Sequence, residues 1–350
     1  MISMYFILEP KSKKEDFFSY EYEYRELKKA LERREKVIAV VGVRRVGKTS
    51  LLNIFYNEVR ELKLWLDGRI VSNPKKDLFS AIYEVAKSGK SQIFGNIESL
   101  NISAFGIGLD IKLASESLIE MEKKIKSAGK MCVFIDEAQR MNRSDLGDVL
   151  SYFYDRFPDV SFIISGSEIG LLEDVLGEYD AEHPLYGRHV AKIEMNRFDK
   201  SNALEFLRLG FKQLKFDVTE DELSEAIGEL DGLVGWLTLY GFERAVAKDK
   251  YALKKTIEIA SRIVASELTG FFKKATRNKA IYVAILDCAH DLSWGELKFK
   301  VERKLDKQLN QNTFNTALSR LVAYSFVEKR NDKYYLSDPL IAKATFLINA

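Results

Sequence analysis

The residues best suited to chemistry in this chain form a glycine-containing loop that ends in a lysine and a threonine. Gly42, Gly47, Lys48 and Thr49 match the spacing G-x-x-x-x-G-K-[ST]. In such a loop, backbone N–H groups turn inward around a phosphate, and the helix that follows adds its positive N-terminal end. Lys48 can then reach the β- and γ-phosphates of a nucleotide, and the Thr49 hydroxyl can ligate Mg²⁺. The pattern therefore predicts a site for ATP or ADP with Mg²⁺.

The residues around this loop predict the elements that position it. Residues 37–41, VIAVV, are typical of a strand buried on both faces, and residues 50–62 carry apolar side chains at helical spacing. A strand, a loop and a helix in this order make an accidental match rarer. We expect the whole loop to contact the nucleotide, namely Gly42, Val43, Arg44, Arg45, Val46, Gly47, Lys48, Thr49 and Ser50.

Two adjacent carboxylates follow a second apolar run, in the segment CVFIDEAQR. Open α/β sheets bind ligands at the carboxyl ends of their strands, which is where Asp136 and Glu137 are expected. Asp136 is placed to hold Mg²⁺, and Glu137 is placed to act as the general base that activates the attacking water. A solvated strand end would look similar, but the phosphate loop upstream favours the catalytic interpretation.

A serine pair and an arginine are weaker candidates for the same site. Ser165 and Ser167 end the next apolar run, where a hydroxyl could contact the γ-phosphate or the water. We prefer Ser165 as the catalytic residue because it lies closer to the strand end, although an ordinary turn explains either serine equally well. Arg188 follows a glycine before the last predicted strand. It could neutralise charge in the transition state, within one chain or across two, or it could form a surface ion pair.

Composition places the chain among globular proteins without pointing to a partner. Of its 350 residues, 46% are hydrophobic and 30% are charged, and the formal net charge is +2. This balance argues neither for nor against nucleic acid. Cys132 and Cys288 allow neither a disulfide framework nor a zinc site, so we expect a reducing cytoplasm. No run approaches the roughly 18 apolar residues of a membrane span, so no membrane contact is expected.

Strands that alternate with helices through residue 196 predict a parallel sheet with helices on both faces. The expected strands are 37–41, 62–71, 131–135, 160–165 and 189–195. Helices are expected at 74–87, 116–127, 144–157 and 169–176, with another ending near residue 34. Residues 97–113 alternate apolar and polar side chains and predict a β-hairpin or strand pair.

The rest of the chain predicts two further domains. Helical patterns at 200–214, 220–230, 236–247 and 251–269 indicate a helical domain. Helices at 281–287, 294–304 and 313–323, followed by a hairpin of 326–329 and 333–336, indicate a winged helix-turn-helix. We therefore expect an ATPase domain at 1–196, a helical lid at 197–276 and a winged helix at 277–350.

The predicted winged helix has a modest positive charge. Residues 277–343 contain twelve Lys and Arg and eight Asp and Glu, for a net charge of +4. Polar residues at the start of its third helix could read base edges, and the basic residues of its wing could contact phosphates. The former are Gln311, Asn312 and Asn315, and the latter are Lys329, Arg330 and Lys333. Because winged helices also dock on proteins, both DNA and a protein partner stay open.

Five segments in order resemble the archaeal P-loop ATPases of the AAA+/STAND group, namely VGVRRVGKTS, FIDEAQR, ISGSEIGLL, PLYGR and YYLSDPL. Some members of that group carry a C-terminal winged helix. The resemblance implies an α/β, three-layer P-loop NTPase with a parallel sheet of the additional-strand type, followed by a helical lid. It also implies a sensor at Ser165 or Ser167 and a family arginine at Arg188. The adenine pocket is implied only loosely, near residues 17–26, and Val234 stands where the lid turn usually has proline.

These patterns together predict an ATP-hydrolysing molecular switch that couples Mg·ATP binding and hydrolysis to movement of a lid and a winged helix. Two other functions are kept open. One is a DNA-binding protein in which ATP gates contact, and the other is a signalling adaptor whose ATPase is nearly silent. We expect a monomer or a nucleotide-dependent oligomer.

Overall fold

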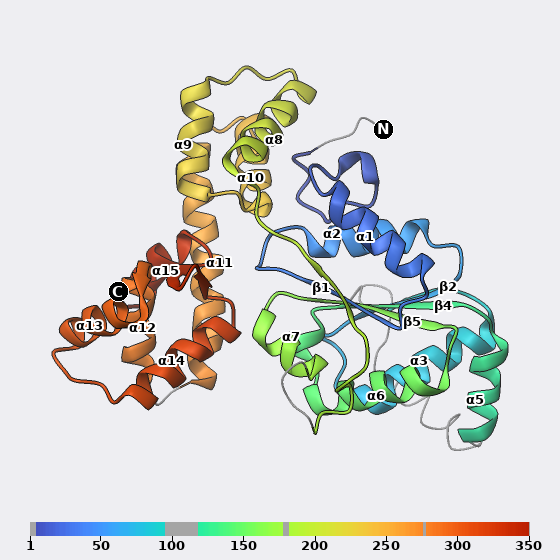
Figure 1. The fold of residues 1–350 in the computed structure, drawn as a ribbon. Coiled ribbons are helices and arrows are strands. Elements are labelled where there is room, and N and C mark those ends of the chain that lie inside the picture. The colour runs from blue at the N-terminus through green and yellow to red at the C-terminus, as the bar shows by residue number, and fades with distance from the viewer. Residues whose placement is uncertain (1–4, 95–117, 178–181, 276–277, 350) are drawn as a thin grey trace.

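The core of the molecule is a six-stranded parallel sheet (Figure 1). The structure is a computed structural model that describes residues 5–94, 118–177, 182–275 and 278–349. The strand order is β3-β2-β4-β5-β1-β6. Their bounds are β1 Val37–Val41, β2 Leu62–Asp67, β3 Gln92–Phe94, β4 Met131–Asp136, β5 Val160–Gly166 and β6 Ala191–Glu194. Because β5 lies between β1 and β4, the predicted additional-strand arrangement is confirmed.

Alternate residues of β1 enter two separate cores, one on each face of the sheet. Ile38 and Val40 pack with α1 (Glu21–Glu32) and α2 (Lys48–Glu58). Val37, Ala39 and Val41 pack against the opposite helices. Those helices are α3 Pro74–Ser88, α5 Leu118–Ser127, α6 Arg143–Arg156 and α7 Ile169–Leu176. A strand buried on both faces must be apolar throughout, which explains the continuous run VIAVV. The predicted three-layer fold is therefore confirmed.

The helices begin where the sequence supplies a cap. The Asn73 side chain accepts a hydrogen bond from the backbone N–H of Lys76, and Pro74 takes the first position of α3. The Asn142 side chain caps α6 in the same way. A short polar side chain at these positions satisfies a backbone donor that the helix leaves unpaired.

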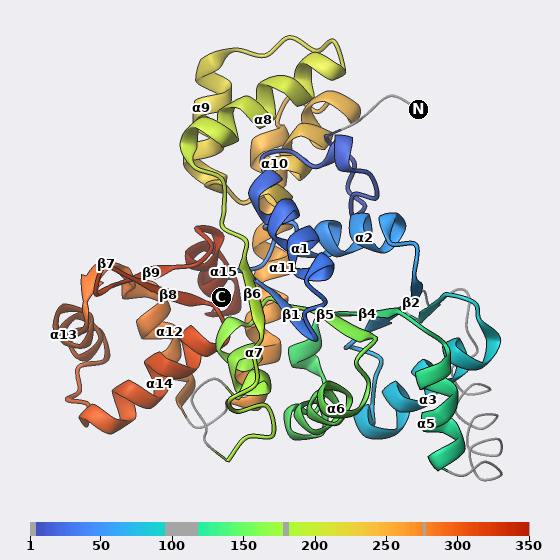
Figure 2. The same cartoon turned by 45° about the vertical axis from the view of Figure 1, so that its right-hand side comes forward.

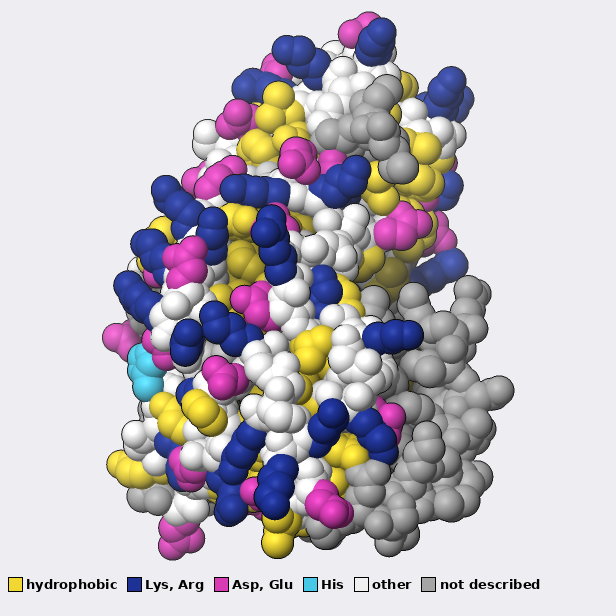
Figure 3. All heavy atoms as spheres, turned by 90° about the vertical axis from the view of Figure 1, so that its right-hand side faces the viewer, with side chains coloured by type: hydrophobic (Ala, Val, Ile, Leu, Met, Phe, Trp, Pro, Cys, Tyr) yellow, Lys and Arg dark blue, Asp and Glu magenta, His cyan; other side chains and the backbone are white. Residues whose placement is uncertain are grey.

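Figure 3 shows Lys and Arg side chains mixed with Asp and Glu over the described part of one face, in keeping with the nearly balanced composition.

Helices alone follow β6 as far as residue 274. They are α8 Lys200–Gln213, α9 Glu220–Leu230, α10 Val234–Gly241, a π-helical turn at Phe242–Val246, and α11 Ala252–Lys274. Figures 1 and 2 both show α11 running from α8–α10 toward the C-terminal elements. There it packs along α15 (Leu340–Asn349). The long helix α11 thus connects two groups of helices.

Besides α15, the C-terminal elements of the described residues are three helices and a small antiparallel sheet of order β7-β9-β8. The helices are α12 Lys279–Cys288, α13 Trp294–Leu305 and α14 Gln311–Ala323. The strands are β7 His290–Ser293, β8 Val327–Arg330 and β9 Lys333–Leu336. The hairpin of β8 and β9 matches the sequence prediction, whereas β7 and α15 were missed. Four residues between two helices are too few to show a strand period.

The remaining sequence predictions agree with the structure to different degrees. The hairpin predicted at 97–113 lies outside the described residues. The second predicted strand ends at Asp67 instead of continuing to residue 71. The domain boundaries near residues 196 and 276 stay predictions. Among the helices of the described ranges, none has the length and apolar character needed to span a bilayer.

Candidate phosphate-binding site

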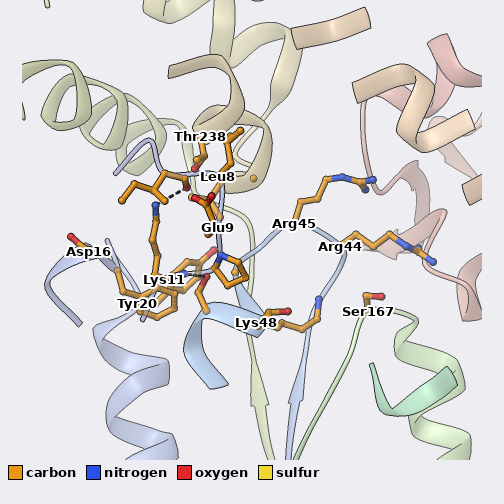
Figure 4. Close-up of a pocket in the computed structure, with 18 of the residues that line it drawn as sticks. Leu8, Glu9, Lys11, Asp16, Tyr20, Arg44, Arg45, Lys48, Ser167 and Thr238 are labelled. Atoms are coloured by element: carbon orange, nitrogen blue, oxygen red, sulfur yellow. Dashed lines mark hydrogen bonds between the residues drawn. The ribbon is translucent and has the colours of Figure 1, made fainter. Parts of the chain in front are cut away.

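The phosphate loop lies at the carboxyl ends of β1, β4 and β5, beside a cavity of about 440 Å³. The cavity has more cationic than acidic lining residues. The cations are Lys11, Arg44, Arg45, Lys48, Arg69 and Arg140, and the acids are Glu9, Asp16, Glu137 and Glu267. Figure 4 shows the cavity between the phosphate loop and the N-terminal segment. This excess of positive charge favours an anionic ligand.

The loop has the backbone conformation that its glycines allow. Gly47 has φ of 95° and precedes the first residue of α2, so the chain enters the helix through a left-handed residue. At Gly42 a Cβ atom would lie 2.3 Å from the carbonyl oxygen of Met195, which follows β6. A side chain at either position would displace the loop. The loop is therefore held against the sheet at one end and at the N-terminus of α2 at the other.

Lys48 lies at the floor of the cavity. Its Nζ donates hydrogen bonds to the carbonyl oxygens of Gly42 (2.8 Å) and Val43 (2.7 Å). Figure 4 shows the side chain lying between the loop and Ser167. Burial lowers the pKa of Lys48 to about 8, although the Glu137 and Asp136 carboxylates oppose this shift. A bound phosphate would supply negative charge that favours the protonated lysine and raises this pKa again.

Thr49 and Asp136 meet beside this lysine. The Thr49 hydroxyl donates a hydrogen bond to the Asp136 carboxylate at 2.9 Å, and the Ser165 hydroxyl donates to its other oxygen. Burial raises the pKa of Asp136, while these two hydrogen bonds oppose the shift. Mg²⁺ prefers oxygen ligands and takes few from the protein, so a hydroxyl and a carboxylate side by side fit it. Within the described ranges, no cluster of three or more His, Cys, Asp or Glu could hold a metal.

Glu137 lines the cavity from the residue after β4. Its backbone is left-handed, with φ of 53°. The carboxylate accepts hydrogen bonds from Gln139 Nε2 at 2.6 Å and from the Ser167 hydroxyl at 3.1 Å. These contacts hold a carboxylate at the wall of the cavity that also contains Lys48. The carboxylate thus borders the cavity in which a polyphosphate at the loop would lie.

The two candidate serines have different surroundings. Ser165, the serine preferred from the sequence, is fully buried and bonds to Asp136. Ser167 lines the cavity and bonds to Glu137. Distance from the strand end did not distinguish them, because Ser165 is the penultimate residue of β5 whereas Ser167 lies in the bend after it, where the alternation of the strand no longer sets the side-chain direction. Ser167 is therefore the serine that a ligand in the cavity can reach.

The structure does not bring Arg188 to this cavity. Arg188 precedes β6, whose first residue Ala191 pairs with Ile38 at the start of β1. The phosphate loop follows the other end of β1, so Arg188 lies near the amino ends of these strands and the loop lies at their carboxyl ends. The Arg188 guanidinium pairs with Asp155 at 2.7 Å. Arg188 is therefore too far from the phosphate loop of its own chain to act there. Its action on the nucleotide of a second chain stays a prediction.

The N-terminal segment forms one wall of the cavity, and no role for it is predicted from the sequence. Residues 7–11 line it, together with Phe17, Phe18 and Tyr20. The Lys11 backbone N–H donates to Ser50 Oγ at 3.0 Å, which ties this segment to α2. The loosely predicted adenine region at 17–26 thus overlaps the wall only in part. The segment is short and has no helix or strand period. The feature of its sequence that could have indicated a buried role is the apolar run YFIL before Pro10.

Comparison with known proteins agrees with this geometry. The family described as an ATPase domain predominantly from Archaea matches residues 17–239. The chain belongs to this family. The matched residues contain the phosphate loop, the Asp136–Glu137 pair, the helices through α9 and most of α10. Family and fold together support ATP binding and hydrolysis at a general level.

Solved structures and one curated protein resemble the chain to different degrees. The Walker-type ATPase PABY2304 of Pyrococcus abyssi is 30% identical with a TM-score of 0.78, and the match covers 98% of this chain and all of that one. The ORC2 protein of Aeropyrum pernix, in ADPNP–ADP complexes, is 14% identical over 94% of this chain and 93% of its own, with a TM-score of 0.57. At that identity it shows the fold alone.

The curated relative is an uncharacterised HTH-type transcriptional regulator of Methanocaldococcus jannaschii. It is 21% identical over 222 residues, and the match covers 56% of this chain. This chain spans about half the length of that relative, since 54% of it is matched.

Proposed function

We propose that this protein is an ATP-hydrolysing molecular switch of the AAA+/STAND type. The observation that carries the proposal is one cavity that places Lys48, the Thr49–Asp136 pair and Glu137 around a phosphate loop. These side chains supply the charge, the metal ligands and the base that phosphoryl transfer to water requires. The family match supports the same chemistry independently.

In the proposed reaction, Lys48 and the loop N–H groups bind the β- and γ-phosphates of ATP. Thr49 and Asp136 would hold Mg²⁺, which neutralises phosphate charge, and Ser165 orients Asp136 through its hydrogen bond. Glu137 accepts a proton from the water that attacks the γ-phosphorus, and ADP and phosphate are the products. Ser167 holds the Glu137 carboxylate at the wall of the cavity.

The switch part of the proposal concerns the lid and the C-terminal elements. Val234 and Gly235 line the cavity, and the Gly235 N–H donates to the Arg45 carbonyl oxygen at 2.9 Å. A change in the loop would therefore reach α10 directly. We propose that 197–276 acts as a lid and that 277–350 is a winged helix whose docking changes with the nucleotide.

Phosphate release from Mg·ATP by the purified wild-type chain tests this function. We expect steady turnover that depends on Mg²⁺. Nucleotide binding without turnover would favour the adaptor alternative with a nearly silent ATPase. Absence of both would end the proposal.

Arg188→Ala tests whether catalysis needs a second chain. If Arg188 reaches the site of a neighbouring copy, turnover should fall at least tenfold with nearly unchanged ATP affinity, because an arginine at the transferring phosphoryl group acts mainly in the transition state (roughly 10³-fold or more in known cases). Activity recovered on mixing Arg188→Ala with Glu137→Gln chains would support this geometry. Arg143→Ala, which removes a comparable surface pair with Asp174, is the control. Full activity of Arg188→Ala would leave the arginine as a surface ion pair.

Duplex DNA binding is a second candidate, favoured by the name of the curated relative and by the exposed Gln311 and Asn312 at the start of α14. The wing itself is less favourable. Lys329 pairs with Asp332, Arg330 with Glu328, and Lys333 with Asp291. These carboxylates compete with DNA phosphates for the same cations.

If the wing contacts DNA, reversing Lys329 and Arg330 to Glu should weaken binding at every sequence. The dependence of log K on log salt should flatten by about two, because two phosphate contacts are lost. Filter binding across a salt series measures both effects. Reversal of Lys124, an exposed lysine on α5, should change neither. No binding by wild type at about 50 mM salt, with ADP or with a non-hydrolysable ATP analogue, would exclude this candidate and favour a protein partner.

A further inference from the structure

Two arginines of the phosphate loop point away from the cavity floor. Figure 4 shows Arg44 and Arg45 extending from the loop toward the C-terminal part of the chain, whereas Lys48 stays beside the phosphate site. Both arginines line the cavity, so their charges are close enough to matter to a bound polyphosphate. Their partners nevertheless come from segments more than a hundred residues away.

Arg45 contacts three elements at once. Its guanidinium lies 2.6 Å from Glu267 Oε1 on α11 and 3.5 Å from Asp338 Oδ2, just before α15. It also lies over the Trp236 ring, 4.1 Å from the centroid. The Trp236 indole N–H donates to the same Asp338 oxygen at 2.8 Å. Arg45 therefore connects the phosphate loop to α10, α11 and the start of α15.

Arg44 makes a parallel set of contacts. Its guanidinium lies 2.7 Å from Glu168 Oε1, and it donates to the Tyr324 carbonyl oxygen at 2.9 Å, at the end of α14. Its Nε lies 3.5 Å from Glu267 Oε2. The guanidinium also lies 5.0 Å from the centroid of the Phe326 ring. Both arginines are mostly buried, so water screens these ion pairs little.

Glu267 is the carboxylate that joins the two arginines. One oxygen pairs with Arg45 and the other with Arg44, and the side chain itself lines the cavity. Guanidinium groups bind carboxylates and phosphates through the same planar set of donors. A γ-phosphate near the loop would therefore compete with Glu267 for both arginines. It would also be repelled by the Glu267 charge.

We propose that Glu267 senses the γ-phosphate by competing with it for Arg44 and Arg45. ADP, whose phosphates end near Lys48, leaves the ion pairs of Glu267 intact. The phosphate loop then stays in contact with α11 and Asp338. ATP draws the arginines toward its γ-phosphate and releases those C-terminal contacts. This inference rests on the proposed function, because it requires nucleotide at the loop. It assigns a definite residue to the coupling between nucleotide and the C-terminal elements.

Glu267→Gln tests the competition, since it removes the charge and keeps the size of the side chain. Calorimetry should show that the preference for AMP-PNP over ADP rises by roughly fivefold or more, which is within the usual range of coupling between sites. Glu258→Gln on the same helix is the control, because Glu258 pairs only with the exposed Arg262 among the described contacts. An unchanged preference, or weaker AMP-PNP binding, would overturn the inference.

Trp236 reports directly on the position of Arg45. In a chain with Trp65→Phe and Trp294→Phe, the remaining fluorescence comes from Trp236, since the sequence has three tryptophans. AMP-PNP should change its emission by removing the guanidinium from the ring, and ADP should not. Equal responses to both nucleotides would contradict the proposed sensing.

These measurements distinguish the proposed function from the sensing role of Glu267. If wild type binds neither nucleotide, the proposed function and this inference both fail. If it binds both nucleotides and Glu267→Gln leaves their ratio unchanged, only the sensing role of Glu267 fails.

Discussion

Glu137→Gln should bind Mg·ATP as tightly as wild type and hydrolyse it about a hundredfold more slowly, or worse. The amide keeps the size of the side chain and can still meet Ser167 and Gln139, which now hold the carboxylate. It cannot accept a proton from the attacking water. Single-turnover phosphate release and calorimetry separate the chemical step from binding.

Glu173→Gln is a suitable control for this prediction. Glu173 is a partly exposed glutamate on α7 that pairs with Lys192 at the surface, where ion pairs contribute little. Both its binding and its turnover should match wild type. Unchanged turnover in Glu137→Gln itself would show that another group is the base.

Lys48→Ala should weaken nucleotide binding at least tenfold, or about 1.4 kcal/mol. The substitution removes the buried positive charge at the floor of the cavity. The carbonyl oxygens of Gly42 and Val43 that it now contacts would face the cavity and could bind water. Calorimetry measures the affinity, and circular dichroism checks the fold. Lys124→Ala should leave binding unchanged, and wild-type affinity in Lys48→Ala would refute the loop assignment.

Because the pKa of Lys48 is lowered, we expect nucleotide affinity to depend on pH. In the free protein this pKa is about 8, against an ordinary value of 10.5, because burial disfavours the charged form. Bound phosphates favour that form and raise the pKa. Below pH 8 the lysine is already protonated, so it adds no pH dependence. Above pH 8 binding must take up a proton, and affinity should fall by up to about tenfold per pH unit. Calorimetry in buffers of different ionisation enthalpy detects that proton, and Lys48→Ala should lack it.

Local sequence determined the parts of the site that one strand and its loop can build. The five residues of β1 match the predicted run, because a strand buried on both faces must be continuously apolar. Gly47 and Lys48 follow at a spacing that only a phosphate loop requires. Asp136 ends β4 and Glu137 follows it, and β4 is separated from β1 only by β5, so the carboxyl ends of these parallel strands lie near the loop.

Tertiary structure decided what each side chain at the site contacts. Ser165 contacts Asp136 and Ser167 contacts Glu137, although only one residue separates the two serines at the end of β5. Arg188 lies near the amino ends of β1 and β6, where its guanidinium pairs with Asp155 instead of lining the cavity.

Arg45 belongs to the predicted loop, yet its partners are Glu267 and Asp338, from α11 and the start of α15. Periodicity and motif spacing reflect contacts within a few residues of the chain. Pairs between distant segments depend on how the helices pack, and no local pattern encodes that packing.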